Sequence, residues 1–498
     1  MTYKNIAFSE ITRYSKISSL IGIVFLLLFF FAPSYALPVY IAITILALAY
    51  VIAQFNLSHF YMIMVFVIPF AVNQKIFHSD VTLLLPSQPI EAIITIAFFI
   101  KLLFGYKVSS SMLKHPIFLL SILCLLMQFV STIRSDIPLV SLKTMFLKSC
   151  YFIVFFVLSA DLYLKQQISH IKLLKVYTFS ILIVGILIFI KHFDYGLSKD
   201  ISGMVTEPFY ADHTIYSACL AFIIPLPLLA YYNSKTLDIN FNQKFWIGCL
   251  ALALLTFFFF TYCRAGWVSL LIAVVITFAI NAGLSFKGLA VTIFSAIILL
   301  FVYQAEIIDG IKQNRSDSNA KNATLEQQTK SVTNITNDQS NAERLNRWSC
   351  AWRMFLDKPF LGYGPGTYQF EYLSYQKKSE MTRISVTSPY NIKKGKGGTA
   401  HSEYLLLLSE TGILSLFFYF GSILVTIYYA LKVYKKAHDP KISIQILMVF
   451  FGLCTYLLHA FFNNFLDTDK AALLYYTSIA YIMVAAIQLK EKPNQTTV

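Results

Sequence analysis

The stretch TAHSEYLLLLSETGILSLFFYF, at 399–420, marks the point where a long polar segment ends and a membrane helix begins. Apolar residues continue almost unbroken from there to Leu431. His401 stands at this boundary, ten intervening residues before Gly412. Histidine is the side chain whose ordinary pKa allows proton exchange near neutral pH. We therefore predict that a membrane-spanning helix begins here. We also predict that His401, beside its start, takes part in a reaction on a substrate held at the bilayer surface.

Composition places the rest of the chain in a membrane too. Of the 498 residues, 57% are hydrophobic and 13% are charged, about half the charged share of a soluble domain. Apolar runs near bilayer length recur along the chain, whereas a transmembrane β-barrel shows short alternating segments. We predict an all-α polytopic membrane protein. The net charge of +15 comes mostly from Lys in short loops, as the positive-inside rule requires, so it does not indicate a nucleic-acid partner.

Hydropathy predicts about 12–14 transmembrane helices, and 14 ranges fit. They lie at roughly 17–33, 38–54, 57–74, 89–104, 116–133, 144–160, 173–192, 214–232, 245–262, 265–281, 287–303, 402–431, 442–462 and 471–489. Pro69 interrupts the third range. The range at 402–431 is long enough to be steeply tilted or to begin outside the bilayer.

The distribution of Lys and Arg predicts the orientation. Basic residues concentrate in alternate loops that include the N-terminus, the cluster Lys432, Lys435 and Lys436, and the C-terminal tail. Both termini are therefore predicted to be cytoplasmic, and the long loop at 304–400 to lie on the outer side. Three regions follow: a transmembrane bundle at 1–303, this loop, and C-terminal transmembrane helices at 401–498.

The long loop has two parts of different composition. Residues 312–343 are rich in Asn, Ser, Thr and Gln, which predicts a flexible, solvated tract. At 344–358, apolar residues with helical spacing predict an amphipathic helix that can lie on the membrane face; these are Leu345, Trp348, Trp352 and Phe355. Pro359 ends this helix. A glycine-rich turn and the patch KKGKGG at 393–398 then lead to His401.

Three arginines are candidates for binding an anion. Arg264 begins a membrane helix, where an unpaired charge is costly, which favours a functional role. The alternative is an anchor that snorkels to the bilayer surface beside Trp267. Arg344 and Arg347 share one face of the amphipathic helix. Their planar guanidinium groups suit phosphate, whereas the alternative is a basic face that touches anionic lipid.

His401 is the candidate base. Thr399 is a plausible N-cap, which would place His401 in the first turn of the next helix, where the positive end of the helix dipole favours neutral imidazole. A neutral ring can accept a proton from a hydroxyl group, although a histidine that is merely hydrogen-bonded at the interface is the alternative. Glu403 and Glu410 lie on one face of this helix, and an acid in an apolar run usually faces the protein interior.

Several motifs occur together in an order that resembles the O-antigen ligase and polymerase superfamily. They are RAGW at 264–267, RWSCAW at 347–352, the G-x-G-x-G-x-Y turn at 362–368, and HSEYL at 401–405 with glycine at the H-x10-G spacing. The segment EPFYADHTIYSACLAFIIPL at 207–226 resembles the family's preceding loop and helix. Residues 1–200 share only a similar pattern of spans.

The resemblance implies an integral-membrane glycosyltransferase of the GT-C type without a nucleotide sugar, metal or cofactor. Its donor would be a glycan on undecaprenyl diphosphate at the periplasmic face of the bacterial inner membrane. Arg264 and Arg347 would hold the diphosphate, Arg344 would tolerate substitution better, and His401 would be catalytic. Glu403, Tyr404 and His213 complete the implied substrate-binding set.

The resemblance implies transfer to a lipid A core acceptor, because ligases of this superfamily carry histidine at the start of the x10-G motif, whereas polymerases often carry arginine there. A glycan polymerase and a protein O-oligosaccharyltransferase are alternatives within the superfamily. The long outer loop and the count of about 14 spans, where the ligases usually have 12, leave the acceptor open. A flippase for lipid-linked oligosaccharides is the alternative from another class, but transporters place charged residues near the bilayer midplane and often repeat in two halves. Here the unusual residues gather on one predicted face.

Overall fold

The computed structural model describes residues 33–75, 82–283, 285–288, 291–292, 295 and 339–491. The regular secondary structure of the described residues is helical with one exception, which confirms the predicted all-α polytopic class. The exception is a two-stranded antiparallel hairpin, in which β1 (Val72–Lys75) pairs with β2 (Thr82–Leu85). The chain separates into two compact units, and the described part of the first comprises 33–63 and 89–107. That unit holds α2 (Pro33–Gln54), the start of α3 (Leu57–Val67) and most of α4 (Ser87–Leu103).

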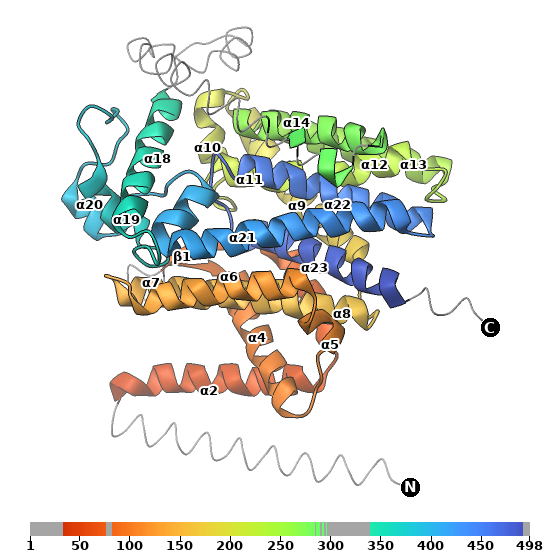
Figure 1. Cartoon of the computed structure of the whole chain (residues 1–498), viewed down its shortest axis with the longest axis horizontal. Coiled ribbons are helices and arrows are strands. Elements are labelled where there is room, and N and C mark those ends of the chain that lie inside the picture. Colours follow the sequence, from red (N-terminus) through yellow and green to blue (C-terminus); the bar gives the residue numbers. More distant parts are fainter. Residues whose placement is uncertain are drawn as a thin grey trace. The chain divides into compact units, whose positions relative to one another are not determined.

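The second unit holds the remaining elements (Figure 1). In its first half these are η1 (Ile68–Phe70), α5 (Ser110–Leu113), α6 (Pro116–Ile133), α7 (Pro138–Tyr151), the π-helix η2 (Phe152–Leu158), α8 (Ser159–Leu164), α9 (His170–Asp194), η3 (Lys199–Ile201), α10 (Ser202–Val205), α11 (His213–Ile223), α12 (Pro225–Tyr232), α13 (Phe241–Phe259) and α14 (Arg264–Asn281). Its second half contains α18 (Gln339–Asp357), α19 (Tyr368–Glu371), η4 (Tyr372–Tyr375), α20 (Pro389–Lys393), α21 (Glu403–Lys436), α22 (Pro440–His459) and α23 (Asp469–Glu491).

Nine helical segments among the described residues are long and apolar enough to span a membrane. They correspond to nine predicted spans, and α6 matches its predicted range residue for residue. The predicted span at 57–74 is wrong at its end, because Pro69 lies in the short η1 turn and β1 follows at Val72. The predicted span at 17–33, apart from its last residue, and most of the one at 287–303 lie outside the described residues.

Polar residues at the helix starts explain several of these boundaries. The side chain of Asp212 accepts a hydrogen bond from the Thr214 amide and caps α11. Asn240 and Gln243 form a capping box at the start of α13. Asp439 caps α22, where Pro440 occupies the first helical position and needs no hydrogen-bond partner for its nitrogen.

Helix α21 is bent back on itself rather than straight. Gly412 adopts φ 77° and ψ −178°, which is a non-helical conformation inside the element. The rings of Tyr404 and Phe420 stack at 5.2 Å although sixteen residues separate them, a distance of roughly 24 Å along a straight helix. The segment at 403–411 therefore forms a short arm that folds against the long arm at 413–436, and α21 lies between α6 and α22 (Figure 1).

We expect Gly412→Ala to destabilise the protein by on the order of 2–4 kcal/mol. Its φ is positive, and an added Cβ would lie 2.1 Å from the carbonyl oxygen of Phe360. Gly421→Ala is the matched control, because its Cβ would meet only Leu120, at 3.5 Å. The apparent melting temperature of each purified variant checks this expectation. Equal melting temperatures for the two variants would show that the bend does not require glycine.

The described part of the long loop folds as a helical subdomain on the bundle. Helix α18 packs against α21 and, with α19, η4 and α20, surrounds a core that includes Cys350, Met354 and Tyr372. The carboxylate of Glu410 accepts hydrogen bonds from the amides of Gly366 and Tyr368 at 2.9 and 3.0 Å, which fastens the glycine-rich turn to α21. Glu410, which lies in an apolar run of the sequence, therefore anchors the glycine-rich turn to α21.

The predicted boundaries of the loop need correction at one point. Helix α18 begins at Gln339, five residues before the predicted start, so the last residues of the tract at 312–343 are helical; the rest of that tract lies outside the described residues. Its buried face includes the polar Glu343 and Arg347 because they hydrogen-bond each other, whereas Trp352 remains 49% exposed. Apolar spacing alone therefore misjudges which face of α18 packs on the protein.

Candidate functional site

His401 lies just outside the helix rather than in its first turn. Helix α21 begins at Glu403, and Ser402 is the N-cap, because its hydroxyl accepts a hydrogen bond from the Leu405 amide. The predicted N-cap, Thr399, instead accepts the amide of His401 at 3.4 Å. His401 has a positive φ of 50°, which is uncommon for a residue with a side chain. The expected cap and position were therefore wrong by a few residues, and His401 occupies a turn.

The surroundings of His401 favour the neutral ring. The pKa of His401 is lowered to about 4, mainly by burial and then by the nearby charges of Arg347 and Arg344. The carboxylate of Asp212 raises this pKa, but its effect is weaker. The side chain of Asn463 lies within hydrogen-bonding range of the ring. An imidazole in this setting carries no proton on one nitrogen at neutral pH, so it can accept one from a hydroxyl group.

Three cations form a row of neighbours that ends at this histidine: Lys199 lies near Arg264, Arg264 near Arg344, and Arg344 near His401. Arg264 is the first residue of α14, Arg344 lies on α18, and Lys199 lies in η3. Burial, then the charge of Arg264, lowers the pKa of Lys199, and Arg264 also lies within electrostatic range of Arg344. Burial lowers the pKa of Arg344 as well. Like charges brought together at partly buried positions indicate an anion site, and the N-terminus of α14 adds its positive dipole.

Asp212 and His213 border the same site. Burial alone would raise the pKa of Asp212, but the His213 ring and the Thr214 amide lower it to about 2, so the carboxylate stays charged. His213 Nδ1 lies 2.9 Å from this carboxylate. His213, a predicted binding residue, is thus at the site, and Asp212 offsets part of the cationic charge.

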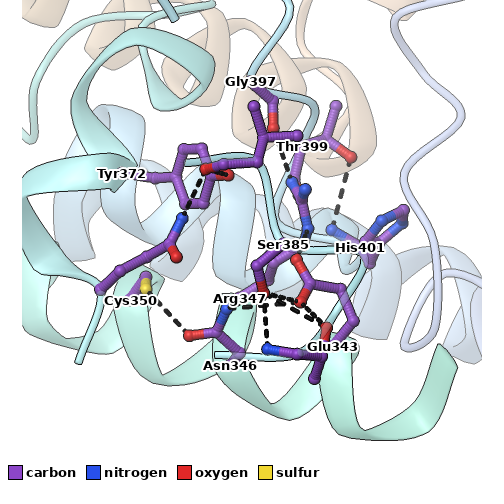
Figure 2. Close-up of polar contacts among 12 residues, drawn as sticks. Glu343, Asn346, Arg347, Cys350, Tyr372, Ser385, Gly397, Thr399 and His401 are labelled. Carbon is purple, nitrogen blue, oxygen red and sulfur yellow. Dashed lines mark hydrogen bonds and ion pairs between the residues drawn. The ribbon is translucent and has the colours of Figure 1, made fainter. Parts of the chain in front are cut away.

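Arg347 points to a different set of partners (Figure 2). Its Nε donates to Glu343 at 2.9 Å, and its Nη1 donates to the carbonyl oxygens of Gly397 and Thr399, each at 2.9 Å. Its guanidinium also lies 5.0 Å from the centre of the Tyr372 ring. Arg344, one turn earlier, is instead the arginine near Arg264 and Asp212.

Glu403 and Tyr404 are buried, and both make hydrogen bonds to backbone groups of neighbouring segments. Glu403 accepts hydrogen bonds from the amides of Phe465 and Leu466 at 2.9 and 3.2 Å. Tyr404 donates to the carbonyl oxygen of Leu457 at 2.7 Å. Glu403 also lines a small cavity of about 40 Å³, together with Lys148. These contacts connect the start of α21 to the end of α22 and to the loop between α22 and α23.

Sequence reasoning missed several residues at this site. Besides Lys199 and Asp212, they are His459, at the end of α22, and Asn463 after it. His459 Nε2 lies 3.5 Å from Cys263 Sγ, next to Arg264, and its Nδ1 has no hydrogen-bond partner among the described residues. A histidine at the end of an apolar run, on the same predicted face as His401, was the available signal. Within the described residues no group of three or more His, Cys, Asp or Glu could hold a metal ion.

The fold and the site define a polytopic α-helical membrane protein whose helix ends gather cations and a neutral histidine at one place. The family model described as O-antigen ligase matches residues 249–420, the range that contains Arg264, Arg344 and His401. Over this range, about a third of its length, the chain is similar to the O-antigen ligase family, whose members are membrane enzymes that transfer glycans, either as ligases or as polymerases. The family implies lipid-linked glycan substrates. No curated protein gives a significant match.

Proposed function

We propose that this protein transfers a glycan from undecaprenyl diphosphate to a lipid A core acceptor at the periplasmic face of the bacterial inner membrane. The observation that carries the proposal is the row of neighbouring cations Lys199, Arg264 and Arg344, whose last member lies near a neutral His401. The three cations would bind the donor diphosphate, and both termini of the chain would be cytoplasmic. Because the cations neutralise the leaving group, the proposal needs no metal or cofactor.

The reaction is a single displacement at the anomeric carbon. His401 accepts the proton of the acceptor hydroxyl while that oxygen forms a bond to the anomeric carbon. The bond from this carbon to the diphosphate oxygen breaks, and its electron pair leaves on the diphosphate. The new charge develops among Arg264, Arg344 and Lys199, whose positions are already set. Attack opposite the leaving group inverts an α-linked donor to a β-linked product.

Donor binding would also strengthen the base. In the protein alone, the positive charges of Arg347 and Arg344 act with burial to lower the pKa of His401. A bound diphosphate brings negative charge next to Arg344 and offsets that effect, so the His401 pKa rises towards neutrality. A general base works best with a pKa near the operating pH. His401 would thus be a stronger base when the donor is in place.

Two alternatives within the same superfamily differ from this function only in the acceptor. A glycan polymerase and a protein O-oligosaccharyltransferase would use the same donor site and the same base. A lipid-linked oligosaccharide flippase is the alternative outside this class. It would need no base, and a neutral histidine within electrostatic range of Arg344 and Arg347 favours transfer over transport.

Deletion of the gene in its host tests the function directly. We expect free lipid A core to accumulate together with lipid-linked polymer, as seen by gel electrophoresis of the surface glycans. Single-repeat products would instead identify a polymerase, and unglycosylated secreted proteins a protein-glycosylating enzyme. Purified protein that moves the donor across liposomes without forming a glycosidic bond would overturn the enzyme assignment.

A further inference from the structure

The segment that carries His401 is held against α18 by one arginine. Arg347 is only 4% exposed, and its guanidinium donates hydrogen bonds to Glu343 and to two backbone carbonyl oxygens. Two of them are the carbonyl oxygens of Gly397 and Thr399, which lie four and two residues before His401. Figure 2 shows the Arg347 side chain between Glu343 and this segment.

The backbone at this segment fits the arginine closely. Gly398 has a positive φ of 80°, and a Cβ there would lie 2.8 Å from Arg347 Nη1, so the guanidinium occupies the space of a side chain. Thr399 then accepts the amide of His401, and Trp348 Nε1 donates to the carbonyl oxygen of His401 at 3.1 Å. A non-glycine residue with positive φ persists only when its surroundings enforce it. Arg347 and Trp348, on one helix, supply that constraint.

Glu343 fixes Arg347 in turn. One carboxylate oxygen accepts Arg347 Nε, and the other accepts the hydroxyl of Thr382 at 2.7 Å and the hydroxyl of Ser385. The guanidinium therefore bridges a carboxylate held by the loop subdomain and two carbonyls of the His401 segment. A planar group with several fixed donors can do this, whereas the single ammonium of lysine cannot reach all three acceptors at once.

We infer that Arg347 is a positioning residue that sets the backbone of His401, while the donor diphosphate binds at Arg264 and Arg344. This inference rests on the proposed function for the identity of the reaction, but it assigns Arg347 a role different from the one that the family resemblance implies. Removing the constraint would let His401 leave its turn without removing a donor-binding group. Arg347→Lys should therefore lower turnover and leave donor affinity unchanged.

The test uses the full-length protein in lipid nanodiscs with a lipid-linked glycan and a lipid A core acceptor. We expect Arg347→Lys to lower kcat roughly 10²-fold, as a misplacement of about 1 Å can do, with the donor Kd within about twofold of wild type. The matched control is Arg353→Lys. Arg353 lies on the same helix and binds a carboxylate, Glu380, and a carbonyl, that of Tyr375, but neither belongs to the His401 segment. Its kcat should be unchanged.

A pH profile adds a readout that loose folding would not produce. His401 faces Arg344 and Arg347 on α18, Asp212 at the start of α11, and Asn463 after α22. Arg347→Gln removes one positive charge, so the acid limb of kcat/KM should move to higher pH, whereas Arg347→Lys keeps the charge and should move it less. Identical acid limbs in both variants and the wild type would contradict a place for Arg347 beside His401.

Other outcomes would overturn the inference. If Arg347→Lys weakens the donor Kd tenfold and keeps kcat at saturation, Arg347 would be a diphosphate ligand. If Arg347→Lys keeps both the wild-type kcat and the wild-type Kd, Arg347 would have neither role. If Arg347→Lys does not accumulate in the membrane, Gly398→Ala serves instead, because its Cβ would displace the guanidinium, and it must show the same loss of kcat at unchanged Kd. Failure of the proposed function is distinguishable, since Arg344→Lys would then leave the donor Kd intact.

Discussion

His401→Ala should lower turnover by about 10²–10⁴-fold, the usual cost of removing a general base. The expected reason is chemical, because the imidazole is the neutral proton acceptor beside the cationic site. Donor affinity should change little, since the diphosphate contacts come from other residues. A purified assay with lipid-linked glycan and acceptor measures kcat, and binding of the labelled donor measures Kd.

His401→Gln separates proton transfer from positioning. Glutamine keeps hydrogen-bonding groups near the same place but cannot take up a proton at neutral pH. We expect turnover nearly as low as that of His401→Ala. Near-normal turnover in His401→Gln would end the general-base assignment, although the residue could still orient the acceptor.

The pH dependence of wild-type activity should reflect the protonation of His401. Activity requires the neutral ring, so it should fall as pH falls through the His401 pKa. In the free enzyme that pKa is about 4, so the acid limb of kcat/KM should lie near there. The limb of kcat reports the donor complex, where the diphosphate charge raises the pKa, and should lie at higher pH.

Arg264→Lys and Arg344→Lys should each weaken donor binding by roughly tenfold or more, the value of a charged hydrogen bond of about 1.4 kcal/mol or greater. A lysine keeps the charge but loses the two-pronged geometry that suits phosphate. The measurement is the Kd of the lipid-linked donor, with thermal stability checked for each variant. Arg344 is thus expected to be the sensitive arginine of its helix for donor affinity, which reverses the order that the family resemblance implies.

The exposed Arg383 provides a control in the same loop, and Arg383→Lys should leave the donor Kd unchanged. Full donor affinity in both Arg264→Lys and Arg344→Lys would count against the diphosphate site. It would restore the interpretation of these arginines as lipid-facing anchors.

The class of protein and most helix positions could be predicted from the sequence alone. Apolar runs of bilayer length specify spanning helices because every backbone group in lipid must be hydrogen-bonded within its own segment. That constraint is local, which is why α6 and α14 start and end within one residue of their predictions. His401 and Arg264 could also be found, because a titratable or charged residue at the end of an apolar run is conspicuous.

Which polar residues meet, by contrast, depends on the tertiary structure. Arg344 and Arg347 are three residues apart on one predicted face, and nothing local tells them apart. The fold directs Arg344 towards Arg264 and Asp212, and Arg347 towards Glu343 and the His401 segment. Lys199, His459 and Asn463 reach the site from helix ends far apart in the chain, and the bend at Gly412 depends on the backbone of Phe360. Such contacts depend on long-range packing, which the periodicity of a single segment does not encode.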